Sequence, residues 1–96
     1  MAASTPRTIA FAVAAPVART ELLGLCARVS ALLEASGAEV AFCDVGGLAA
    51  DVVTVEALAR LQLAARQHGS RVRLRNASPE LRDLVALMGL REVLSE

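Results

Sequence analysis

The chain has 96 residues, of which 55% are hydrophobic and 21% charged, a composition that fits one folded domain and excludes disorder as its default state. Ten arginines and no lysine balance ten acidic residues, and a net charge of zero argues against nucleic acid as the main partner. Trp and Tyr are absent and Phe occurs twice, so the chain offers little aromatic surface on which bases could stack.

The first predicted element is a strand over residues 8–14 (TIAFAVA), in which larger apolar residues alternate with alanines. Residues 1–7 before it are expected to be flexible, and Pro16 interrupts the strand. A helix then begins near Thr20, a favourable N-cap, and closes at Gly37. Its core-facing stripe is predicted to contain Leu22, Leu25, Cys26, Val29, Leu32 and Leu33.

The second strand, over residues 39–45, contains the continuous apolar run Val40–Cys43, which is typical of a strand covered on both faces. Asp44 ends this run, and we interpret it as a turn residue that bonds the backbone two positions on; a ligand role is the alternative. The Gly-Gly pair that follows gives the backbone freedom for a loop. This loop, residues 45–53, lies at the carboxyl end of the strand, where open α/β sheets usually place their working surface.

The second helix is predicted to run from about Thr54 to His68, and the lone histidine at its end is not expected to bind a metal. Its buried stripe is predicted to contain Val55, Leu58, Leu61 and Ala65. Its N-cap is Asp51 or Thr54; alternatively, Thr54 presents a hydroxyl for phosphorylation at the helix N-terminus. Leu63 falls on the outward side beside Glu56, and it is either a single exposed leucine or part of a docking patch.

The third strand, over residues 71–76 (RVRLRN), alternates strictly, with Val and Leu on one face and arginines on the other. We interpret the arginines as a solvated face paired with the chain's own carboxylates; the alternatives are binding of phosphate, acidic lipid headgroups or an acidic partner. Ser78 and Pro79 begin a last helix that Gly89 ends, and the tail over 91–96 is expected to cover an edge. The buried stripe of that helix is predicted to contain Leu81, Leu84, Val85 and Met88.

This alternation of strands and helices predicts an α/β fold with a mainly parallel sheet, in a single domain over residues 1–96. The chain has no nucleophile–His–carboxylate set, no GxGxxG and no GxxxxGK[ST], and Asp44 with Asp51 supply too few ligands for a metal site. We therefore expect neither enzyme activity nor a cofactor. Cys26 and Cys43 lie inside apolar patterns and are predicted to be free core thiols in a reduced compartment. Because no signal peptide or spanning run is visible, a cytoplasmic location is expected.

Five segments follow one another in a recognisable order: the strand ending at Asp44, the loop DVGGLAAD, the helix VEALARLQLAAR, the segment RVRLRNASPELRDL and the ending LMGLREVL. Together they resemble a STAS domain, the fold of bacterial anti-sigma factor antagonists and of the small STAS subunit of lipid-transport ABC systems. The resemblance covers roughly residues 22–94. It implies a sheet of about four strands, mainly parallel and flanked by helices, and a regulatory binding activity without turnover.

The chain departs from the STAS pattern at the start of the second helix, where the family has Asp-Ser-Ser-Gly. Asp51 matches the family's Asp, but Val52 stands at the phosphorylated Ser position and cannot accept phosphate. Val53 and Thr54 replace the Ser and Gly that follow. The resemblance therefore implies either a fixed docking surface or a switch relocated to Thr54.

We predict that a protein partner binds the 44–54 loop and the start and outer face of the second helix. The predicted partner-binding residues are Leu48, Asp51, Val52, Thr54, Glu56 and Leu63. The resemblance implies an anti-sigma factor or a kinase-like protein as the partner. The alternatives are the ATPase of a lipid-transport ABC complex, and a small anion or nucleotide at the N-terminus of the second helix. Neither nucleic-acid binding nor membrane insertion is expected, and a homodimer stays open.

Overall fold

Strands and helices alternate along the chain as the sequence predicts. The computed structural model describes residues 7–13 and 19–94, apart from the side chains of residues 19–23. Its elements are β1 (Thr8–Ala12), α1 (Arg19–Ser36), β2 (Val40–Asp44), α2 (Val52–Gln67), β3 (Arg71–Arg75) and α3 (Pro79–Leu87). The expected end of the first strand at Ala14, and Pro16 after it, lie outside the described residues.

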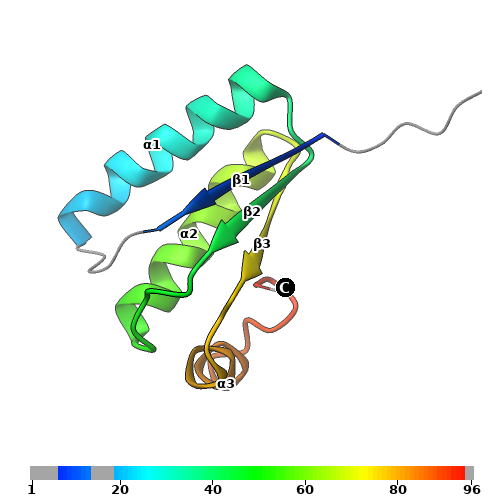
Figure 1. The fold of residues 1–96 in the computed structure, drawn as a ribbon. Helices are drawn as coiled ribbons and strands as arrows, with labels where there is room; N and C mark the ends of the chain where they lie inside the picture. The colour runs from blue at the N-terminus through cyan, green and yellow to red at the C-terminus, as the bar shows by residue number, and fades with distance from the viewer. Residues whose placement is uncertain (1–6, 14–18, 95–96) are drawn as a thin grey trace, which may run out of the picture.

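The strands form a parallel sheet in the order β1-β2-β3. In its first row Thr8 pairs with Val40, and Val40 pairs with Arg71. Because consecutive strands are parallel neighbours, each connecting helix returns along the sheet, and crossovers of one hand place both helices on the same face. α1 and α2 accordingly lie on one side of the sheet (Figure 1). The α/β class is confirmed, whereas a fourth strand is not present in the described part of the chain.

The hydrophobic core fills the space between this helical layer and one face of the sheet. Every second strand residue points into it, and Ala41 and Cys43 of β2 are completely buried. On α2 the predicted stripe is confirmed, since all four of its members are buried. Figure 1 shows α3 beyond the carboxyl end of β3, where Leu81 and Val85 join the same core.

Three predictions about burial are wrong. β2 is not covered on both faces, because both helices lie on one side and leave Val40 and Phe42 only half-buried on the other. Leu32 is 49% exposed, because it stands at the margin of the α1 stripe, about 80° from its centre. Met88 is 38% exposed, because α3 ends at Leu87 and Met88 is its C-cap rather than a core position.

Gln62 of α2 seals the outer edge of β3. The residue is 3% exposed, and its side-chain amide accepts a hydrogen bond from the Val72 backbone N–H (2.7 Å) and donates one to the Val72 carbonyl (3.1 Å). The same amide donates to the Val93 carbonyl (2.6 Å) in the tail. Gln62 thus takes the place of a neighbouring strand at this edge. It also holds the tail, at Val93, beside the same edge, and the sequence predicts that the tail covers an edge.

Candidate functional site at the carboxyl end of β2

Asp44 fixes the loop that leaves β2. Its Oδ1 accepts a hydrogen bond from the Gly46 N–H (2.9 Å), which confirms the turn interpretation. Its Oδ2 accepts from the side-chain amide of Asn76 (3.0 Å), which follows β3 with a left-handed φ of 60°. The carboxylate therefore ties together the loops that leave two neighbouring strands, and both of its oxygens are engaged.

Asp51 is the N-cap of α2. Its backbone is extended (φ −132°, ψ 166°), and its Oδ1 accepts a hydrogen bond from the Thr54 N–H (2.7 Å). That hydrogen bond, together with one from the Thr54 hydroxyl, holds the pKa of Asp51 below its ordinary value. Because Asp51 rather than Thr54 is the cap, α2 begins at Val52, two residues earlier than predicted.

Thr54 lies on the inward side of the first turn of α2. It is 4% exposed, and its hydroxyl interacts with the Asp51 carboxylate. A kinase would reach this hydroxyl only if the cap and the first turn opened. Phosphorylation of Thr54 stays a prediction, and this geometry does not favour it.

The outward side of α2 carries two large apolar residues, Val52 and Leu63, which are 53% and 63% exposed. They are eleven positions apart, about three helical turns, and therefore lie on one stripe, with Glu56 and Ala59 between them. The exposure predicted for Leu63 is confirmed. Glu56 Oε1 lies 3.5 Å from Arg60 Nη2, one helical turn further along α2, in a favourable i,i+4 pair.

Leu48 is the one predicted site residue in this loop that belongs to the core. It is 8% exposed, and its N–H donates to the Val45 carbonyl in a tight turn (3.1 Å). The structure therefore brings Asp51, Val52 and Glu56 together at the start of α2. Leu48 instead packs into the hydrophobic core and anchors the loop there.

Both cysteines, Cys43 at the end of β2 and Cys26 on α1, are free thiols. Cys43 next to Asp44 is fully buried, and burial raises the pKa of its thiol to about 12, with a smaller contribution from the Asp44 carboxylate. Burial also raises the pKa of Cys26, against the opposing effect of Arg60. Both thiols are therefore protonated and poorly nucleophilic at neutral pH. Within the described residues, no group of three or more His, Cys, Asp or Glu could hold a metal ion.

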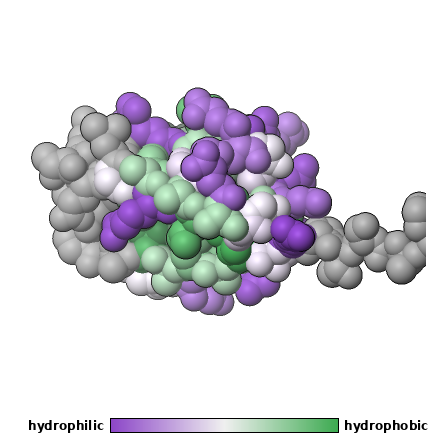
Figure 2. Space-filling view, turned by 90° about the horizontal axis from the view of Figure 1, so that it is seen from above, coloured by the Kyte–Doolittle hydropathy of each residue, from purple (hydrophilic) through white to green (hydrophobic). Residues whose placement is uncertain are grey.

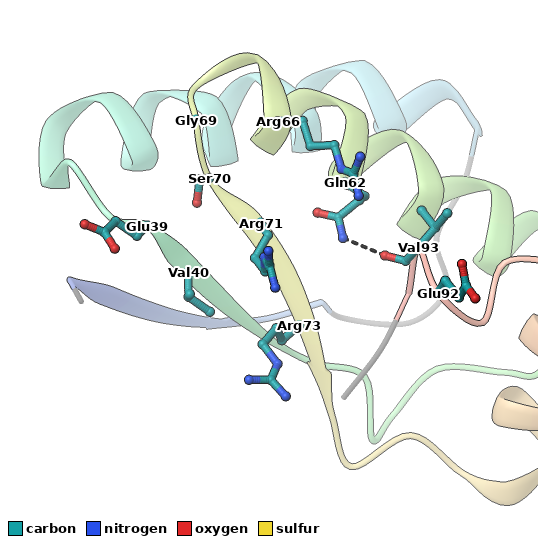
Figure 3. A pocket seen from close by; sticks show the side chains of 10 residues that line it. All are labelled: Glu39, Val40, Gln62, Arg66, Gly69, Ser70, Arg71, Arg73, Glu92 and Val93. Atoms are coloured by element: carbon teal, nitrogen blue, oxygen red, sulfur yellow. Dashed lines mark hydrogen bonds between the residues drawn. The ribbon is translucent and has the colours of Figure 1, made fainter. Parts of the chain in front are cut away.

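A hollow lies at the opposite end of the sheet, where β2 and β3 begin (Figure 3). It has a volume of about 840 Å³ and is lined by both signs of charge, including Arg66, Arg71, Glu39 and Glu92. Ser70 lines it as well, and the buried Ser70 hydroxyl has no hydrogen-bond partner among the described residues. The C-terminus of α2, which is the negative end of its helix dipole, also adjoins this hollow. Positive and negative charges are therefore mixed there.

Comparison with protein-family models and with curated proteins finds no match for this chain. The relation to STAS domains therefore rests on the order of the sequence segments and stays a proposal. None of the described helices is long and apolar enough to cross a membrane.

Proposed function

We propose that this protein is a non-catalytic regulatory module that binds another protein, in the manner of the STAS-type anti-sigma factor antagonists. The observation that carries the proposal is the exposed stripe of α2, in which Val52 and Leu63 stand 53% and 63% exposed on one face. Glu56 lies between them, so the stripe combines apolar side chains with a carboxylate. Apolar residues repeated along one helix face are the usual anchors for a groove on a partner.

The loop before α2 supports the proposal because it holds this stripe in a fixed place. Asp44 pins one end of the loop through two hydrogen bonds, and Asp51 caps the helix at the other. A preorganised surface loses less conformational entropy on binding. Covering the exposed parts of the Val52 and Leu63 side chains would contribute about 1–2 kcal/mol for each.

Docking at this site would be constitutive. Val52 occupies the position at which STAS domains carry the phosphorylated serine, and its side chain has no hydroxyl. The negatively charged Asp51 already occupies the N-terminus of α2. That arrangement does not favour the alternative of an anion or nucleotide at the same helix end.

Affinity capture from an extract of the cells that produce the protein tests the proposal, with the bound protein identified by mass spectrometry. The decisive variant is Leu63→Glu, and Leu87→Glu on α3 is its matched control because Leu87 is also exposed, at 83%. We expect an anti-sigma factor or kinase-like protein that Leu63→Glu loses and Leu87→Glu retains. An ABC ATPase with the same dependence would select the transporter alternative. Equal capture by both variants would remove the α2 stripe from consideration.

A further inference from the structure

The face of the sheet that points away from α1 and α2 is open in the described part of the chain. Its rows are Thr8–Val40–Arg71, Ala10–Phe42–Arg73 and Ala12–Asp44–Arg75, as the strand register sets them. The β1 and β3 members are exposed and the β2 members half-buried. Parallel sheets are nearly always covered on both faces. We therefore expect another molecule to bind over this uncovered face.

The open face has a cationic side and an apolar side. The arginines of β3 form its cationic column, and Figure 3 shows the side chains of Arg73 and Val40 on the side of the sheet away from α2. Asp44 is the single carboxylate of the nine residues, and both its oxygens are already engaged. Ala10 and Ala12 make the β1 side shallow and apolar. In the view from above Figure 1, onto β1 and α1, hydrophobic residues form a band bordered by hydrophilic ones (Figure 2).

We propose that this open face binds an acidic amphipathic helix of a partner protein, at a surface distinct from the outer stripe of α2. Alternate residues of a parallel strand are about 6.6 Å apart, and residues i and i+4 of a helix are about 6 Å apart. Glutamates at i and i+4 therefore match the spacing of the arginine column. The apolar side of the same helix covers Val40 and the alanines, which leave room for a close approach.

Phe42 argues for a helix and against a nucleic acid as the occupant. The guanidinium carbon of Arg75 lies 3.8 Å from the centre of the Phe42 ring, so a cation already occupies a face of the only aromatic ring in the three rows. Base stacking needs a free ring face. A chain with zero net charge also lacks the general attraction for phosphates on which nucleic-acid binding depends.

A titration followed by ¹⁵N–¹H NMR tests this proposal with a defined probe. The probe is a synthetic helical peptide of 16 to 18 residues (roughly the length of α1 or α2) with glutamates at i and i+4 on one flank and leucines on the other. The controls are a scrambled peptide of the same composition and a peptide with lysine in place of each glutamate. We expect amide shifts confined to β1, β2 and β3 with the acidic peptide alone.

Two double variants locate the binding surface. Arg71→Glu with Arg75→Glu should weaken the acidic peptide at least tenfold and create binding of the lysine peptide. Arg28→Glu with Arg91→Glu makes the same charge change at exposed positions of α1 and the tail, and should change neither. If the first variant misfolds, Arg71→Gln with Arg75→Gln removes the two positive charges without reversing them, and it should also weaken binding of the acidic peptide. The Leu63→Glu variant should bind the acidic peptide normally, which separates this proposal from the α2 stripe.

Several outcomes would overturn the proposal. They are shifts that fall on α2, equal binding of the scrambled peptide, equal loss from the Arg28 and Arg91 control, or absence of binding. Tighter binding of an RNA oligonucleotide or of anionic vesicles would replace the helix with another occupant. Dimerisation seen by analytical ultracentrifugation and lost in the Arg71 and Arg75 variant would show that a second copy of the chain, rather than a partner's helix, covers this face.

Discussion

Replacing Gln62 by Leu should destabilise the protein strongly, because the Gln62 amide satisfies buried backbone groups of β3. Leu has nearly the same size, so the change removes three hydrogen bonds without opening a large cavity. Two of these bonds serve the N–H and the carbonyl of Val72, a residue that is 1% exposed. A buried backbone group that loses its partner costs about 1–3 kcal/mol, so we expect a loss of about 2–5 kcal/mol.

Chemical denaturation followed by far-UV circular dichroism measures this loss, since the chain has no Trp or Tyr to report by fluorescence. The thermal midpoint should fall by about 8–40 °C, given about 4–8 °C per kcal/mol for a domain of this size. The matched control is Gln67→Leu, the same chemical change at the exposed last residue of α2, which should stay within about 0.5 kcal/mol of wild type. A Gln62→Leu variant as stable as that control would refute the role given to Gln62.

The remaining stability predictions concern two titrating groups. Since burial raises the pKa of Cys43 from 9.0 to about 12, its contribution to stability is complete below pH 9 and is lost as the pH rises toward 12. The chain has no Lys or Tyr to obscure this window, and Cys26 is present in both proteins. The slope, to which the Cys43 thiol contributes at most about 1.4 kcal/mol per pH unit, should therefore shrink in Cys43→Ala. Because the pKa of Asp51 is lowered, its stabilising effect is present above pH 3.8 and is lost as the pH falls through the folded-state pKa. Wild type should therefore melt above Asp51→Asn, which keeps a capping oxygen without the charge, at neutral pH, and this difference should close in acid; a difference that persists in acid would contradict this.

The sequence predicts those features that depend on near neighbours in the chain. The alternation in β3, the Ser78-Pro79 helix start and the Asp44 turn each involve residues at most three positions apart, and each is present in the structure. Such signals are local because backbone hydrogen bonds and side-chain direction are set within one turn or one pair of strand residues.

Features that depend on distant residues could not be predicted in this way. Gln62 bonds Val72 and Val93, which are ten and thirty-one positions away, and nothing around Gln62 in the sequence marks it as a strand substitute. The open face of β2 was missed because an apolar run does not reveal that both helices lie on the same side. Thr54 lies seven positions before Leu61 and therefore on the buried stripe of α2, but its burial is not evident when the helix is taken to begin at Thr54 rather than at Val52.

The central claim is that the outer stripe of α2 docks onto a protein partner. The most direct test is the dissociation constant of the captured partner, measured by isothermal titration calorimetry for wild type, Leu63→Glu and Leu87→Glu. We predict about tenfold weaker binding for Leu63→Glu, since covering the exposed part of Leu63 contributes about 1–2 kcal/mol, and no change for Leu87→Glu. A Leu63→Glu affinity within twofold of wild type would contradict the claim.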